Sequence, residues 1–166
     1  MAFDAFLKID GIPGESTDDK HKDWIEILSY NFGMNQPSSA TASSAGGAST
    51  ERVNVHDLTI VKHIDKASPK LYELCCSGKH IANVTVELCR AGGDKVKYME
   101  VKLEQVIISS AQPGGSAQGP DALPSETISF NFGKAKWTYT QQKRADGTGG
   151  GNVTGGWDLT ANKVYA

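Results

Sequence analysis

The chain has 166 residues, of which 39% are hydrophobic and 18 are glycines, and its formal net charge is −2 at pH 7. This length is typical of one domain with a substantial core, so we take residues 1–166 as a single domain. The near-neutral charge, with both signs interspersed, argues against nucleic acid or an anionic membrane surface as a partner. No apolar run approaches the roughly 18 residues of a transmembrane helix, so we expect no membrane insertion.

The N-terminus predicts a strand and no cleaved signal peptide. Phe3, Ala5, Leu7 and Ile9 share one face of an extended chain, which favours a strand from Phe3 to Ile9. The segment lacks the basic start and the apolar stretch of a secretory signal. We therefore expect a protein that is made in the cytoplasm and that, if it is secreted, uses a route without a cleaved signal peptide.

The next two segments differ sharply in composition. Residues 24–33 predict a second strand, and one of its faces becomes small and polar at Ser29 and Asn31. Residues 35–51 are almost all Ser, Ala, Thr and Gly, with no side chain able to anchor a core. A flexible loop of this length is either a solvated connection without a role or a segment that becomes ordered when a partner binds.

Residues 53–78 predict a strand followed by one short helix. Val, Ile and Thr are dense from Val53 to Lys62, which favours a strand. Ser68 is a good N-cap and Pro69 suits the first helical position. An apolar stripe follows, and Gly78 can end the helix in the left-handed conformation. We predict a helix from Pro69 to Ser77 and no other helix.

The rest of the chain predicts long strands with breaks. Strands are expected over residues 81–90, 96–110, 127–142 and 157–161, with loops at 112–124 and 145–156. The alternation changes phase at Gln105–Ile108 and at Gly133–Lys134, where β-bulges are expected. Many bulged strands with one helix predict a mainly β fold, an antiparallel β-barrel of two packed sheets.

Residues that could carry chemistry are scattered. His56 and Asp57 fall on opposite faces of a strand, and Asp65 is explained by the start of the helix. The three cysteines are not at metal-ligand spacing and are expected to be reduced packing residues; they are Cys75, Cys76 and Cys89. We therefore expect no enzyme, no metal and no cofactor. A monomeric carbohydrate-binding β-module using Trp137, Tyr139 and Trp157 is the alternative.

The chain resembles the haemolysin-coregulated protein (Hcp) family of bacterial type VI secretion. The resemblance rests on several short motifs in a fixed order: Phe3 to Ile9, Gly14 to Ser16, Val53 to Leu58, Ile64 to Leu71, Ser77 to His80, Arg90 to Gly93, and Gly156 to Asp158. It implies a ring-forming β-barrel protomer, a homo-hexamer with a wide channel, and rings that stack into a secreted tube. It also implies contact with sheath, spike and baseplate proteins and small secreted effectors carried in the lumen.

The resemblance suggests roles for particular residues. Ser29 and Asn31 are candidates for the channel wall, because an otherwise apolar strand face turns small and polar there. Three segments are candidates for contact between stacked rings: the Gly92–Gly93 turn, the end from Trp157 to Thr160, and the loop from Ser38 to Ala48.

Overall fold

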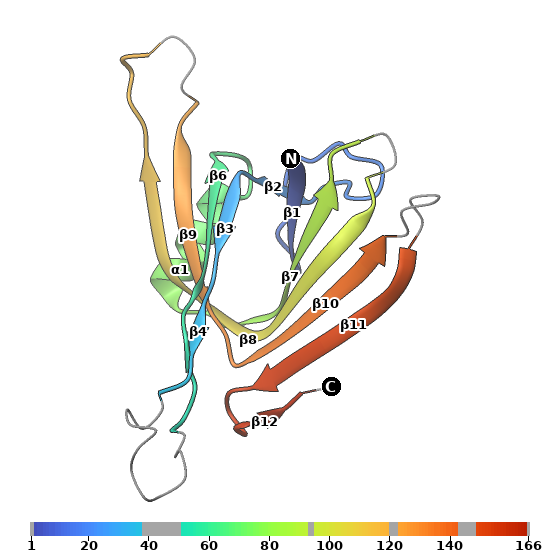
Figure 1. Cartoon of the computed structure of the whole chain (residues 1–166). Coiled ribbons are helices and arrows are strands. Elements are labelled where there is room, and N and C mark those ends of the chain that lie inside the picture. Colours follow the sequence, from blue (N-terminus) through green and yellow to red (C-terminus); the bar gives the residue numbers. More distant parts are fainter. Residues whose placement is uncertain (1, 38–50, 93–94, 120–122, 143–148, 166) are drawn as a thin grey trace, which may run out of the picture.

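The computed structural model describes residues 2–37, 51–92, 95–119, 123–142 and 149–165. Twelve strands and one helix are assigned within these ranges (Figure 1). In chain order they are β1 (Phe3–Ile9), β2 (Ile25–Ile27), β3 (Ser29–Asn31), β4 (Met34–Asn35), β5 (Asn54–Val55), β6 (Leu58–His63), α1 (Ser68–Ser77), β7 (Ile81–Arg90), β8 (Lys97–Gly114), β9 (Ser125–Asn131), β10 (Lys134–Gln142), β11 (Gly149–Asp158) and β12 (Lys163–Val164). The mainly β fold with one short helix agrees with the prediction.

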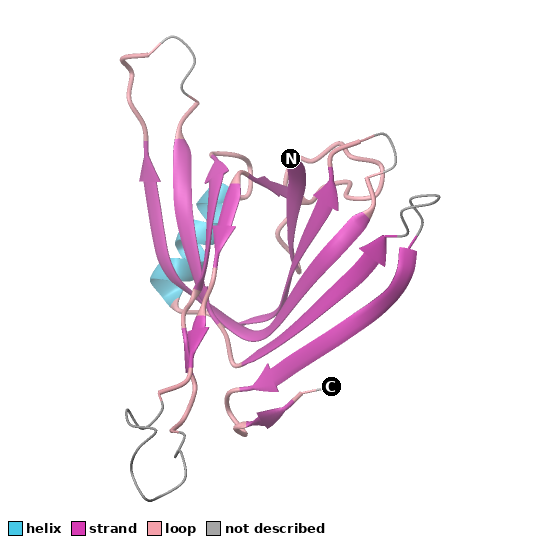
Figure 2. Ribbon diagram, in the orientation of Figure 1, coloured by secondary structure: helices cyan, strands magenta, loops and turns pink. Residues whose placement is uncertain are grey.

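The strands form two antiparallel sheets that share the long strand β8. In the larger sheet the order is β12-β11-β10-β8-β7-β1-β2, and in the smaller sheet it is β3-β6-β9-β8. β4 and β5 form a separate two-stranded ribbon. Figure 2 shows that the two sheets approach each other at the bend of β8 and separate above it. Their inner faces pack together as the two walls of a barrel that is not one continuous hydrogen-bonded cylinder.

The bend of β8 lies at Gln105, whose φ is 55°. β8 pairs with β10 up to this bend, as far as Glu104 opposite Lys134, and with β7 one residue past it, at Val106 opposite Ile81. After it β8 pairs with β9, starting at Ile107 opposite Asn131. The predicted break at Gln105–Ile108 is therefore confirmed, and it is the point where one strand passes from one sheet to the other.

Three strands that the sequence predicted as continuous are each divided in the structure. Residues 53–62 give β5 in the two-stranded ribbon and β6 in the smaller sheet. Residues 24–33 give β2 in the larger sheet and β3 in the smaller one, and between them the Leu28 N–H donates to Val61 O at 2.7 Å. Residues 127–142 are split at Phe132–Gly133 into β9 and β10. Alternation alone cannot show such a change, because it records the face of a residue and not its partner strand. The glycine-rich residues 149–156, expected as a loop, belong to β11.

One core joins the two sheets and the helix. It contains Leu7, Val86 and Leu103 from the larger sheet and Ile60 and Phe130 from the smaller one. Phe32 and Trp137 stack across the gap between the sheets, with ring centroids 6.4 Å apart. α1 contributes Leu71 and Leu74 to the same core. No helix within the described part of the chain is long and apolar enough to cross a membrane.

The helix starts differently from the prediction. Ser68 is its first residue, the N-cap position is Ala67, and no side chain caps it. The Ser68 hydroxyl instead accepts from the backbone N–H of Asp65 at 3.0 Å and donates to Glu126 at 2.6 Å. A buried carboxylate on β9 therefore competes for the hydroxyl that the sequence suggested as a cap. Gly78 ends the helix as predicted, with φ 65°.

Candidate functional site

The smaller sheet presents a small, uncharged face on its outer side. Two rows of paired residues cross β3, β6, β9 and the second half of β8. One row is Ser29, Val61, Thr127 and Gln112, and the other is Asn31, Thr59, Ser129 and Ser110. We call these eight residues the polar face. None of them carries a charge, and Val61 is the only apolar member.

Strand alternation produces this face directly. On β9 the buried residues Glu126, Ile128 and Phe130 alternate with Thr127 and Ser129, which point away from the core. Residues directly paired in an antiparallel sheet lie on the same side, so the outward positions of the four strands line up. The Thr59 and Ser129 hydroxyls are hydrogen-bonded at 3.0 Å.

Ser29 and Asn31 occupy the β3 edge of the polar face, and both are exposed. Both residues were predicted from the sequence as channel-wall candidates, whereas their partners on β6, β9 and β8 were not. The signal was present in residues 125–131, where small polar residues alternate with apolar ones. What the sequence could not supply was the register that places these residues beside β6 and β8.

Asp57 lies at the margin of the polar face, and hydrogen bonds hold its carboxylate. Ser109 Oγ donates to it at 2.6 Å and Asn131 Nδ2 at 2.9 Å. His56, its neighbour, donates its backbone N–H to Gly33 O at 2.8 Å. His56 and Asp57 therefore link the start of β6 to the neighbouring strands, which agrees with a structural role for both residues.

The outer side of the larger sheet is charged. Glu100 on β8 pairs with Lys97 at 2.5 Å and with Lys102 at 3.3 Å. Burial raises the pKa of Glu100, but the hydrogen bonds from these two lysines outweigh it and leave this pKa below its usual range. The outer side of the smaller sheet is therefore uncharged, whereas the outer side of the larger sheet is charged.

The candidate ring-contact residues lie at two ends of the larger sheet. The β7–β8 turn, which contains Gly92, and the β11–β12 turn lie at opposite ends of it in Figure 1. Thr160, in the β11–β12 turn, donates its hydroxyl to Asp158 Oδ1 at 2.6 Å. This bond, followed by one from the Ala161 backbone N–H, holds the pKa of Asp158 below its usual range. Gly93 and the loop from Ser38 to Ala48 lie outside the described residues.

The three aromatic rings of the carbohydrate alternative do not form an exposed platform. Trp137 is half-buried against Phe32. Trp157 has its indole nitrogen buried, without a hydrogen-bond partner among the described residues. Tyr139 is the only one of the three that is substantially exposed, at 46%. Without a shared flat surface, the rings cannot stack together on a sugar.

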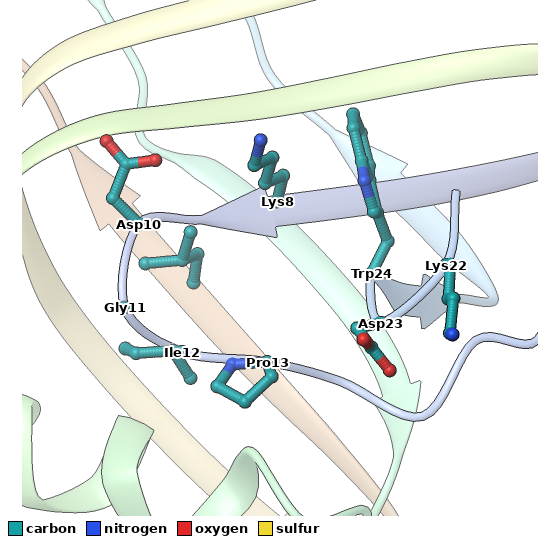
Figure 3. A pocket seen from close by; sticks show the side chains of 9 residues that line it. Lys8, Asp10, Gly11, Ile12, Pro13, Lys22, Asp23 and Trp24 are labelled. Atoms are coloured by element: carbon teal, nitrogen blue, oxygen red, sulfur yellow. The ribbon is translucent and has the colours of Figure 1, made fainter. Parts of the chain in front are cut away.

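Figure 3 shows a surface pocket of about 390 Å³ beside the end of β1. Its lining combines Lys8, Asp10, Lys22, Asp23 and Trp24 with Ile9, Gly11, Ile12 and Pro13. The Lys8 ammonium lies 5.7 Å from the Trp24 ring, and Asp10 accepts from Asn83 at 3.4 Å. These nine residues include no Ser, Cys or His, so the lining offers no Ser–His or Cys–His pair.

Comparisons with known proteins identify the family of this chain. The family model described as "Type VI secretion system effector, Hcp" matches residues 6–139. Protein hcp1 of Pseudomonas aeruginosa is 39% identical over 163 residues, which is 98% of both chains.

Two solved structures give the same result. One, described as a type six secretion system protein, has a TM-score of 0.92 and 35% identity, and the match covers 99% of this chain and 100% of the other. Hcp1 from Salmonella typhimurium has a TM-score of 0.81 and 38% identity over the same shares of the two chains. The carbohydrate-binding alternative finds no support in these relatives. The chain belongs to the Hcp family, the tube and effector proteins of the type VI secretion system.

Proposed function

We propose that six copies of this chain form a ring, that the rings stack into the inner tube of the secretion apparatus, and that the polar face lines the channel. The observation that carries the proposal is the register of the smaller sheet. It brings Ser29 and Asn31 into two rows with the small residues of β6, β9 and β8.

The chemistry of the polar face suits a channel wall. Short Ser, Thr and Asn side chains keep the bore wide, and their hydroxyl and amide groups hydrogen-bond to water or to a passing polypeptide. The eight residues of the polar face carry no charge, and the carboxylate at its margin, Asp57, is held by Ser109 and Asn131, so cargo of either sign can enter and leave. The charged outer side of the larger sheet would then face away from the channel, toward the sheath.

The partners follow from this arrangement. Small secreted effectors would be carried against the polar face, held by hydrogen bonds from groups such as Asn31. Sheath, spike and baseplate proteins would contact the assembled tube. The ring would assemble in the cytoplasm and leave the cell with the tube, without a cleaved signal peptide. No catalytic step is part of this function.

The two ends of the larger sheet would meet between stacked rings. The turn with Gly92 and Gly93 would form one rim, and the segment from Trp157 to Thr160 would form the other. The bonds from Thr160 and Ala161 to Asp158 support this assignment because they give the second rim a fixed shape. The loop from Ser38 to Ala48 would add a further contact.

Light scattering and electron microscopy of the purified chain test the ring. We expect a mass of about six subunits and a central hole, whereas a carbohydrate-binding module is expected to be a monomer. Asn31→Tyr should narrow or fill the hole seen in averaged images and should reduce the retention of co-expressed effectors. Thr138→Tyr, on the outer side of β10, is the matched control and should leave the hole unchanged. An unchanged hole and unchanged retention with Asn31→Tyr would refute the assignment of the channel wall.

A further inference from the structure

His21 is an ionisable residue that lies on the outer side of the larger sheet, away from the core, and is nevertheless buried. Only 3% of the residue is exposed. Its ring stacks on Phe6, with centroids 4.2 Å apart and planes at 4°, and Trp24 meets it edge-on at 4.8 Å. A buried imidazole needs polar partners at both nitrogens, and their identity decides what this site can do.

Three more side chains converge on the imidazole. Nδ1 lies 2.6 Å from Asp18 Oδ2, and Nε2 lies 2.5 Å from Glu87 Oε2. Cys89 Sγ is 3.9 Å from Nε2. The ligand atoms of His21, Glu87 and Cys89 all lie within 4.8 Å of one another. Nitrogen, oxygen and sulfur donors at this spacing are a set that suits Zn²⁺.

The two strand ligands sit on a strand paired on both sides. Glu87 and Cys89 are two residues apart on β7, which pairs with β1 on one side and with β8 on the other, where the register shifts between Leu88 and Cys89. Glu87 lies opposite Phe6 of β1, the residue on which the His21 ring stacks. A site on a central strand keeps its ligands in place better than one on loops.

We propose that His21, Glu87 and Cys89 bind one Zn²⁺ ion through Nε2, Oε2 and Sγ, with Asp18 holding the imidazole in the orientation that binding needs. Asp18 accepts the Nδ1 hydrogen, which leaves Nε2 free for the metal; a carboxylate in this position is a common partner of zinc-bound histidine. A water molecule would take the fourth position.

The charged groups already at the site suit a cation. Asp18 and Glu87 each place a carboxylate oxygen against one imidazole nitrogen, so a Zn²⁺ ion bound at Nε2 would be paired with the Glu87 carboxylate. Binding through Sγ requires the thiol to lose its proton to the solvent, as zinc binding by cysteine does in general.

The geometry requires one small adjustment. The Nε2–Sγ distance of 3.9 Å is close to what two ligands of one zinc ion show, whereas Nε2 and Oε2 must separate from 2.5 Å to about 3.3 Å. The Glu87 side chain is 15% exposed, and a rotation about its terminal torsion, which is broad for Glu, would supply this separation. Lys97 Nζ lies 3.4 Å from the other carboxylate oxygen and 2.5 Å from Glu100, and Lys95 holds Asp18 at 3.1 Å.

Calorimetric titration of the metal-stripped full chain with zinc chloride tests the proposal. In buffers of different ionisation enthalpy we expect one ion per chain and proton release on binding, because the Cys89 thiol must lose its proton to bind the metal. Titration with Co²⁺ should give the thiolate-to-cobalt absorption band of a sulfur ligand. Cys89→Ala should abolish this band, and Asp18→Asn, a change in a positioning residue, should weaken zinc binding about 10- to 100-fold.

Cys76→Ala is the matched control, because Cys76 is an exposed thiol on α1; it should change neither the band nor the affinity. Glu87→Gln is a second test variant for the case that Cys89→Ala disturbs the fold. It keeps the size of the side chain and should weaken zinc binding at least tenfold. Failure of the wild-type chain to bind zinc, or a cobalt band and a zinc affinity that are unchanged in Cys89→Ala, would overturn the proposal. Neither result depends on ring assembly, so the proposed channel function stands or falls separately.

Discussion

Lys62 and Glu126 face each other across β6 and β9, and their ion pair is completely buried, with both side chains 0% exposed. The same carboxylate accepts from the Ser68 and Tyr72 hydroxyls of α1, and the Lys62 ammonium also binds Asp65 at 2.9 Å. Burial raises the pKa of Glu126, but these hydrogen bonds outweigh it and leave the pKa below its usual range. The cluster fixes the helix to the smaller sheet.

Breaking this pair from one side should destabilise the protein strongly. Lys62→Met leaves a buried carboxylate without its counter-charge, which we expect to reduce the free energy of unfolding by about 3–5 kcal/mol. Urea unfolding followed by tryptophan fluorescence measures the change, at a protein concentration where light scattering gives the same mass for all variants.

The double variant Lys62→Met/Glu126→Gln should recover part of the loss, because the amide is neutral and its oxygen still accepts from α1. The exposed Lys70–Glu73 pair, whose side chains are 53% and 67% exposed, provides the control. Lys70→Met should change the stability by less than about 1 kcal/mol. Equal losses for Lys62→Met and Lys70→Met would contradict a structural role for the buried pair.

Alkaline pH should weaken the same cluster through Tyr72. Burial, followed by the hydrogen bond to Glu126, raises the pKa of the Tyr72 phenol from 10.0 to about 12. Because the folded-state pKa is the higher one, the phenol contributes its full stability below pH 10, and this contribution is lost as the pH rises through 12. Spectrophotometric titration should show one phenolate forming near pH 12, and Tyr72→Phe should remove it. A Tyr72 phenolate already formed near pH 10 would contradict the contact.

Local patterns explain how much of the architecture could be predicted. Alternation found most strands, the phase change located the bend at Gln105, and Gly78 marked the end of α1. The partner of each strand could not be predicted from these patterns, because pairing is decided by residues far apart in the chain. β11 is the clearest case: its glycines favour a loop locally, yet pairing with β10 from Gly149 to Asp158 makes it a strand.

Candidate site residues could likewise be predicted only where their signal is local in the sequence. Ser29 and Asn31 could be found because their polarity is a local change within one strand. Lys62 and Glu126 could not be found, since 64 residues separate them and no motif connects them. The helix cap was wrong for the same reason, because Ser68 bonds to that distant carboxylate and to Asp65 instead of capping α1.

Two adjacent glycines of β11 should respond oppositely to the same substitution. A methyl group at Gly156 would overlap the backbone carbonyl of Tyr165 and come within 3.2 Å of Ala135 O, and backbone atoms cannot rotate away. A methyl group at Gly155 would meet nothing within 4 Å. Gly156→Ala should therefore release β12, whereas Gly155→Ala should be tolerated.

Limited trypsin digestion followed by mass spectrometry checks the release of β12. Cleavage after Lys163 should be faster in Gly156→Ala than in the wild type, because Tyr165 loses its bonds to Gly156 O and to Glu104. Gly155→Ala should match the wild type. Equal cleavage rates for the two variants would show that β12 does not depend on the contact at Gly156.

Removing the loop from Ser38 to Ala48 should spare the ring and impair tube growth. The two ends of this loop are already joined, since Met34 and Asn35 pair with Val55 and Asn54, and the Glu51 N–H donates to Pro37 O at 3.2 Å. A short turn can therefore close the β4–β5 ribbon without the deleted residues. Ser49→Asn with Thr50→Gly in the deletion variant supplies the sequence that a two-residue hairpin turn prefers.

Light scattering should give the deletion variant the same ring mass as the full chain, and electron microscopy should show shorter or fewer stacks. A variant in which residues 38–48 are replaced by a Gly/Ser sequence of equal length separates the role of loop length from that of loop sequence. A monomeric deletion variant would contradict the prediction, because the loop would then be needed within the ring and not only between rings.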